Sequence, residues 1–291
     1  MTPLVAAAVL AAAVTHAGWN AIAHAIKDQL VAFTLIGGGA AVLGALIAPF
    51  VPLPAAGAWP YLIASALLHV GYQALLMRSF SLGDFGQMYP IARGTAPLVV
   101  TVAAVFLVDE RLNGWQLGGV VFASAGLVGV ALWGILPPGR RKSAGPGSRP
   151  HWPAILAALA TGLSIAAYTV VDGLGVRASG TPVGYIAWLM ILEGILIPAY
   201  AAYSRRGALL GQLRPYAARG LLGAALSMAA YGLILWAQTR APLAPVAALR
   251  ESSIIVGAAI GAVFFKERFG APRIAAAALM VVGIGLMLRA G

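Results

Sequence analysis

Residues 89–97 read Tyr-Pro-Ile-Ala-Arg-Gly-Thr-Ala-Pro, and they place Arg93 in the middle of an otherwise apolar run. Arg93 is the only charged residue between Asp84 and Asp109, so it would lie roughly nine residues, or about 13 Å, inside a membrane-spanning helix. Burying a guanidinium there costs at least about 2.5 kcal/mol, which indicates a function. Pro90 and Pro97 remove backbone donors and predict an interrupted helix around the charge.

A second arrangement of this kind follows in residues 245–255, where Arg250 and Glu251 interrupt another apolar run beside Pro245. Arg93 and Arg250 are 157 residues apart and fall at the same depth of their runs. We therefore expect two interrupted helices that face each other, with the rest of the chain as the frame that holds them.

Composition identifies a membrane protein. Of 291 residues, 61% are hydrophobic and 9% are charged, with a net charge of +11, whereas soluble domains carry roughly 25% charged residues. Apolar runs of about 20 residues recur from end to end, so we predict a polytopic protein without a soluble domain. The absence of cysteine excludes disulfides and thiolate metal sites, and the first run lacks the basic start of a cleaved signal peptide.

The predicted fold is all-α, with ten transmembrane helices. The expected spans are residues 3–24, 31–51, 59–80, 85–108, 114–136, 152–174, 182–203, 215–238, 243–265 and 271–288. A linker rich in Pro, Gly, Ser and Arg, residues 137–151, separates the fifth span from the sixth. We expect a first five-helix repeat in residues 1–136 and a second in residues 152–291.

The two halves resemble each other in sequence. At an offset of 157, Arg93 aligns with Arg250 and Glu110 with Glu267; at an offset of 149, Trp19 aligns with Tyr168. Five spans is an odd number, so the halves would enter the membrane in opposite orientations. The pattern predicts an inverted repeat around a central cavity, as in many secondary transporters.

Basic residues predict the topology. Thirteen of them fall in the linkers after the odd-numbered spans, and four (Arg111, Arg177, Arg240 and Arg289) fall on the other side. The positive-inside rule then places the 137–151 linker in the cytoplasm and both termini in the periplasm.

Polar side chains gather on single faces of the first and third spans, because they follow helical i, i+3, i+4 spacing. The residues are His16, Trp19 and Asn20, and then His69, Tyr72 and Gln73. The fourth, sixth, eighth and ninth spans add Tyr89, Tyr168, Tyr231, Arg250 and Glu251. We expect these six spans to surround the cavity, and the fifth and tenth spans, rich in glycine, to pack outside it.

Other interpretations stay open for several of these residues. Histidines and hydroxyl residues in membrane helices often only hydrogen-bond neighbouring helices, and Arg250 with Glu251 could form a structural pair with Arg93. Glu193, near the middle of the seventh span, is a buried carboxylate that could carry a proton.

These features together resemble the drug/metabolite transporter superfamily, and most of all its EamA-type branch. The resemblance is carried by residues 102–110, 112–114 and 126–130, by residues 262–269 and 283–288, and by the His-Ala-Gly-Trp-Asn stretch of residues 16–20. It implies ten helices around a cavity and export of amino acids, metabolites or toxic compounds across the bacterial inner membrane. Members of the branch commonly keep their termini in the cytoplasm, the reverse of what the loop charges indicate here.

Our first hypothesis is a secondary transporter that exports small zwitterionic metabolites, in particular amino acids. Arg93 or Arg250 would bind the carboxylate, and Glu251 or Glu193 would meet the ammonium group or a coupling proton. The alternative is an exporter of lipophilic cations, in which Glu193 binds the cation and the arginines are structural. The sequence predicts no enzyme, metal or cofactor, since no metal-ligand spacing occurs. The expected partners are a small molecule and the lipid bilayer, without nucleic acid, and a monomer is the working expectation.

Overall fold

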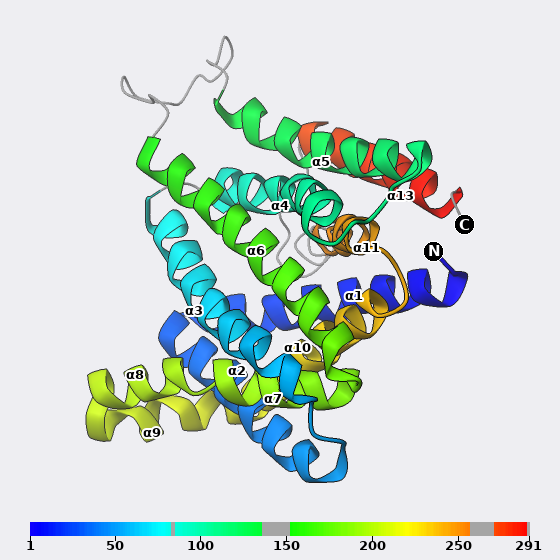
Figure 1. The fold of residues 1–291 in the computed structure, drawn as a ribbon. Helices are drawn as coiled ribbons and strands as arrows, with labels where there is room; N and C mark the ends of the chain where they lie inside the picture. Colours follow the sequence, from blue (N-terminus) through cyan, green and yellow to red (C-terminus); the bar gives the residue numbers. More distant parts are fainter. Residues whose placement is uncertain (83–84, 136–151, 257–270, 290–291) are drawn as a thin grey trace, which may run out of the picture.

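The computed structural model describes residues 1–82, 85–135, 152–256 and 271–289, and none of these residues forms a β-strand (Figure 1). The first half contains α1 (Pro3–Ala25), α2 (Gln29–Ile47), α3 (Trp59–Leu82), α4 (Phe85–Leu107) and α5 (Gly114–Ile135). The second half contains α6 (Trp152–Ser179), α7 (Pro182–Glu193), α8 (Leu196–Arg205), α9 (Leu209–Leu213), α10 (Ala217–Gln238), α11 (Leu243–Arg250) and α13 (Ala271–Arg289). The expected linker at residues 137–151 lies outside the described residues.

Four described segments are long and apolar enough to cross a membrane: Pro3–Ala25, Gln29–Phe50, Trp152–Ser179 and Pro182–Gln238. Large apolar side chains cover the outer surface as well, such as Leu67, Phe106 and Val281, which are 62%, 81% and 60% exposed. An apolar exterior of this kind suits lipid rather than water. The chain is thus a multi-pass membrane protein, while the count of ten crossings stays a prediction.

Local sequence sets the helix starts. Thr2 accepts a hydrogen bond from the backbone of Val5 and precedes a proline at the first position of α1. Asp28 caps α2 by accepting from the N–H groups of Leu30 and Val31. Each cap supplies an acceptor to helix N–H groups that have no partner within the helix.

The helices pack in pairs that join the two halves of the chain. The pairs are α3 with α6, α1 with α10, α2 with α7, and α5 with α13, and Figure 1 shows α5 and α13 side by side at one edge of the bundle. A Cβ added at Gly119 would lie 2.6 Å from the carbonyl oxygen of Gly283, and one at Gly283 would lie 2.6 Å from that of Gly119. Only glycine permits this approach, so the glycine-rich fifth and tenth spans do pack closely against each other.

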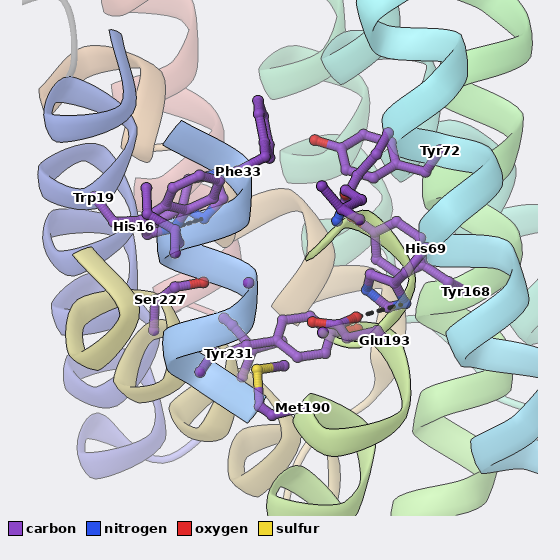
Figure 2. A pocket seen from close by; sticks show the side chains of 18 of the residues that line it. His16, Trp19, Phe33, His69, Tyr72, Tyr168, Met190, Glu193, Ser227 and Tyr231 are labelled. Carbon is purple, nitrogen blue, oxygen red and sulfur yellow. Dashed lines mark hydrogen bonds and ion pairs between the residues drawn. The ribbon is translucent and has the colours of Figure 1, made fainter. Parts of the chain in front are cut away.

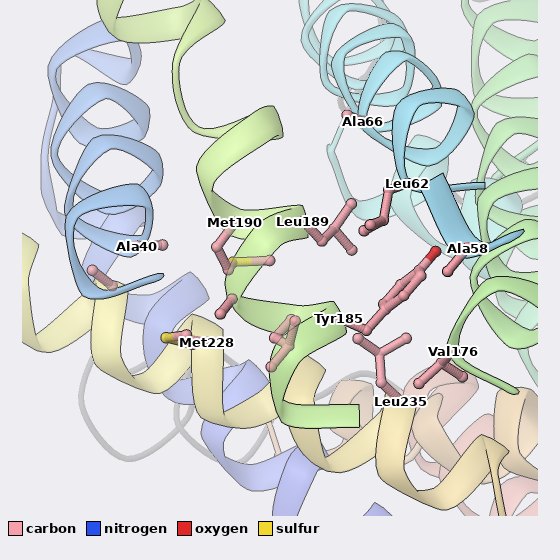
Figure 3. Packing of buried hydrophobic residues seen from close by; sticks show 13 residues of the cluster. Ala40, Ala58, Leu62, Ala66, Val176, Tyr185, Leu189, Met190, Met228 and Leu235 are labelled. Carbon is pink, nitrogen blue, oxygen red and sulfur yellow. The ribbon is translucent and has the colours of Figure 1, made fainter. Parts of the chain in front are cut away.

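An apolar core lies between α2, α3, α6, α7 and α10 (Figure 3). Tyr185 of α7 is fully buried within it, among Ala58, Leu62 and Val176. This core holds α7 against the helices on either side, and it therefore fixes the end of α7 that reaches the cavity described below.

Two of the described helices are interrupted, and only one of them is among the two that the sequence indicated. The backbone turns at Glu251 and Ser252 after α11 and becomes helical again at Ser253, as expected. In contrast, α4 continues through Pro90 and Pro97 as one helix. The second break lies at Gly194–Ile195, between α7 and α8, where a Cβ on Gly194 would collide with the carbonyl oxygen of Gly37 on α2.

Glu110, which follows α4, forms a polar clamp at one end of the bundle. Its carboxylate accepts from Arg177 of α6 at 2.9 Å and from the backbone N–H of Leu243, the first residue of α11, at 2.7 Å. Arg177 also donates to the carbonyl oxygens of Gln238 and Ala241. The clamp ties the loop of the first half to three helices of the second half.

Candidate functional site: a polar cavity inside the bundle

A cavity of about 90 Å³ lies among α1, α2, α3, α6, α7, α8, α10 and the end of α11, large enough for several water molecules. Nine of the residues singled out in the sequence line it: His16, Trp19, His69, Tyr72, Gln73, Tyr168, Glu193, Tyr231 and Arg250. Figure 2 shows His16 and Trp19 on one side and Tyr72, His69 and Glu193 on the other.

The set of helices that line the cavity differs in part from the expected set. α2, α7 and α8 contribute Phe33, Gly37, Glu193 and Pro198, among others, whereas no described side chain of α4 lines the cavity. The expectation that the fourth span lines it followed from the polarity of that span. The charged side chain of α4, that of Arg93, lies instead against the residues that follow α11, as described below.

The α1 wall is held by contacts within its own helix. The indole N–H of Trp19 donates to Nδ1 of His16 at 3.2 Å, with the two rings edge to face. Asn20 donates to the carbonyl oxygen of His16 at 2.8 Å and is not among the lining residues. The spacing thus places the side chains of His16 and Trp19 at the cavity, whereas the side chain of Asn20 is bonded to the backbone of the same helix.

The opposite wall carries Glu193 and His69. Nδ1 of His69 lies 3.6 Å from Oε2 of Glu193 and 3.0 Å from the carbonyl oxygen of Ser65. The His69 ring stacks on Tyr168, with centroids 4.0 Å apart. Glu193 is the last residue of α7, so the break in that helix directly follows the acidic residue of the cavity. Oε2 of Glu193 is buried and makes no hydrogen bond.

Arg250, the last residue of α11, supplies the positive charge of the cavity. It is 4% exposed, and neither Nε nor Nη2 has a hydrogen-bond partner. Its nearest acid among the described residues is Glu251, with 3.8 Å between Nε and Oε1, and its guanidinium carbon lies 5.9 Å from the Tyr168 ring centroid. A buried guanidinium with unsatisfied donors can bind an anionic group.

Arg93 has a different environment. Its Nε donates to Oε2 of Glu251 at 2.7 Å and its Nη2 donates to Ser253 at 3.3 Å. Arg93 and Glu251 are 2% and 1% exposed, and neither lines the cavity. Glu251 is thus neutralised mainly by Arg93, which leaves the charge of Arg250 largely uncompensated. Tyr89 belongs to α4, and its side chain is outside the described part of the structure.

The sequence reasoning missed Asp172. This residue of α6 is fully buried and accepts hydrogen bonds from the hydroxyl of Tyr185, at 2.9 Å, and from that of Tyr231. The signal was available, because Asp172 is an acidic residue within an apolar run, as Glu193 is. It was overlooked because it is near the predicted end of the sixth span, at residue 174, whereas α6 continues to Ser179.

Nothing in the described structure suggests a metal centre: no group of three or more His, Asp or Glu side chains among those residues could hold an ion.

Comparison with known proteins agrees with this architecture. Twenty-eight chains of solved structures match. One of them, a crystal structure of a protein, aligns with 98% of this chain and 96% of its own length at 18% identity and a TM-score of 0.69. At that identity the match establishes the fold alone. No curated protein matches.

Residues 152–289 match the family model described as the EamA-like transporter family. This segment contains α6 to α13 and carries Tyr168, Asp172, Glu193, Tyr231 and Arg250 of the site. By this match, residues 152–289 belong to the EamA-like transporter family, which is part of the drug/metabolite transporter superfamily.

Proposed function

We propose that this transporter exports small zwitterionic metabolites, in particular amino acids, across the bacterial inner membrane by alternating access. A single observation carries the proposal: Arg250 and Glu193, opposite in charge and both with unsatisfied polar atoms, line the same cavity. A zwitterion offers one partner to each of them, so both charges are compensated when it binds.

In this proposal Arg250 binds the substrate carboxylate. Its unpaired Nε and Nη2 can donate two parallel hydrogen bonds, the geometry in which arginine binds carboxylates most strongly. Arg93 then acts as a positioning residue, because it holds Glu251 and so prevents that carboxylate from pairing closely with Arg250.

Glu193 binds the substrate ammonium group. The rings of Tyr168 and Tyr231 flank His69 beside it, and aromatic faces add attraction for a cation. The remaining lining is apolar, from Ile36, Met190, Ile197 and Pro198 among others. Few polar groups and an apolar wall favour recognition of the charged groups with a tolerant choice of substrate side chain.

Alternating access is supported by the pairing of the helices. If the halves are inverted repeats, α3 corresponds to α10 and α6 corresponds to α1. The α3–α6 pair then corresponds to the α10–α1 pair, and both pairs are present. The breaks after Glu193 and Arg250 put two half-helix ends at the cavity, as in other transporters with discontinuous helices. The ten crossings, the domain boundary at residues 137–151 and periplasmic termini belong to the same proposal.

The alternative of a lipophilic-cation exporter draws on Glu193 and the aromatic residues around it. An unneutralised Arg250 at the same cavity argues against it, since burying two like charges together is costly.

Competition in proteoliposomes tests the proposal. An unlabelled panel competes with labelled leucine: leucine itself, its methyl ester, the corresponding acid without the amino group, and a cationic dye. We expect only the complete zwitterion to compete strongly, because each of the other molecules leaves one charged wall unpaired. Transport of the labelled dye, with no transport of labelled leucine, would establish the cation exporter instead. The same panel is then tested against labelled phenylalanine, an amino acid with a different side chain.

A further inference from the structure

Asp172 differs from the other acidic residues in the partners that hold it. Glu251, Glu110 and Asp28 each lie 2.7–2.9 Å from an arginine nitrogen, and Glu193 lies 3.6 Å from His69. Among the buried or partly buried acids that the structure describes, Asp172 alone is held by neutral hydroxyls. Burying an ionised carboxylate without a cation is costly, and binding a proton removes that charge.

Asp172 is nevertheless connected to the cavity. Tyr231, which donates to its Oδ2, is one of the lining residues, and the Tyr231 ring packs edge to face on His69 with centroids 5.4 Å apart. His69 is in turn 3.6 Å from Glu193. Figure 2 shows Tyr231, His69 and Glu193 gathered at one wall. A proton in the cavity can therefore reach Asp172 through Tyr231 without passing through apolar protein.

The two protonation states of Asp172 require different partners. An ionised carboxylate only accepts, so it can hold the hydroxyl of Tyr185 on α7 and that of Tyr231 on α10 together, as observed. A protonated carboxyl carries one O–H donor and keeps part of its acceptor capacity, so when that O–H points at one of the two tyrosines, the tyrosine must turn its own hydroxyl proton to a different acceptor. Tyr185 lies in the packed core, whereas Tyr231 has the cavity beside it, so Tyr231 is the one that can move.

We propose that Asp172 is the coupling-proton site of this transporter, behind the cavity wall, and that Tyr231 passes its protonation state to the substrate site. The proposal rests on the proposed function, in which Glu193 binds the substrate ammonium group and so cannot also carry the proton. Titratable groups that interact with Asp172 come from four helices: His69 on α3, Tyr168 on α6 itself, Tyr185 and Glu193 on α7, and Tyr231 on α10, and Arg250 of α11 acts on Tyr231.

A substrate-free measurement tests the proton site directly. The purified protein in lipid is compared at acidic and at alkaline pH by infrared difference spectroscopy, which detects the C=O stretch of protonated carboxyl groups. We expect Asp172→Asn to lose one such band and Tyr185→Phe, the matched control away from the cavity, to keep it. An unchanged spectrum in Asp172→Asn overturns the proposal.

A transport measurement tests the coupling. In proteoliposomes, exchange of labelled for unlabelled leucine needs no net proton movement, whereas accumulation driven by a pH gradient does. We expect Asp172→Asn to exchange but to accumulate no more than without a gradient, and Tyr231→Phe to do the same while keeping the infrared band. Normal gradient-driven accumulation in Tyr231→Phe overturns the proposal even if Asp172→Asn fails to fold.

The two proposals fail differently. If the wild-type protein neither exchanges nor accumulates any amino acid, the proposed substrate is wrong, and the infrared measurement still decides whether Asp172 binds a proton. If exchange is normal and gradient-driven accumulation survives in Asp172→Asn, the substrate stands and the proton site is wrong.

Discussion

Arg93 and Arg250 are the same residue type, 157 positions apart, and the bundle places them in opposite situations. Arg93 is 2% exposed, with Glu251 at 2.7 Å and Ser253 at 3.3 Å, away from the cavity. Arg250 is 4% exposed, with its nearest carboxylate oxygen at 3.8 Å and two donors unsatisfied, and it lines the cavity.

The difference shows that the depth of a charge in the membrane indicates a function but does not specify which one. Both guanidinium groups are costly to bury. One is compensated by a carboxylate within the protein, and the other is left to be compensated by a ligand. The single acid Glu251 distinguishes them, because its Oε2 lies 2.7 Å from Arg93 whereas its Oε1 lies 3.8 Å from Arg250.

The largest expected effect is on stability. Arg93→Met removes the close partner of Glu251 and leaves a buried, poorly paired carboxylate, which costs about 3–5 kcal/mol. The free energy of unfolding, measured with denaturant in detergent micelles, should fall by that amount. The double variant Arg93→Met with Glu251→Leu should recover most of the loss, because it also removes the carboxylate that Arg93→Met leaves poorly paired. A double variant as unstable as the single one would show that Arg93 acts through other contacts.

The second effect is on transport. Arg250→Gln should lower the rate of leucine exchange at limiting substrate by roughly 100-fold, which corresponds to about 3 kcal/mol for the loss of a charge-assisted bidentate contact. Its stability should change little, since Arg250 makes no close ion pair. Arg250→Lys is the matched control and should keep part of the activity. Exchange at the wild-type rate in Arg250→Gln would show that Arg250 does not bind the substrate carboxylate.

The smallest effect concerns Tyr168, whose ring lies 5.9 Å from the guanidinium carbon of Arg250 and stacks on His69. Tyr168→Leu should raise KM for exchange about fivefold, or about 1 kcal/mol, because it removes an aromatic face beside both charged walls. Tyr168→Phe keeps the face and should behave as wild type in the same assay. A strong defect in Tyr168→Phe would instead assign the role to the hydroxyl group.

Much of the fold follows from the sequence because lipid imposes strong rules on it. Apolar runs of the length of a bilayer must be helices, and glycine on facing spans permits close contact, as at Gly119 and Gly283. The breaks were harder to predict. Proline at positions 90 and 97 leaves α4 continuous, since a membrane helix can tolerate the lost hydrogen bonds. The break at Gly194 depends on the close approach of α2, which no local pattern reveals.

The sequence by itself determined that the charged residues Arg93, Arg250 and Glu193 must have a function, because burial of a charged group in an apolar run is costly wherever it occurs. Only the tertiary structure decided which charge neutralises which. Pairing depends on distances of a few ångströms between helices far apart in the chain, such as the 2.7 Å from Arg93 to Glu251, and Coulomb and hydrogen-bond energies fall steeply over that range.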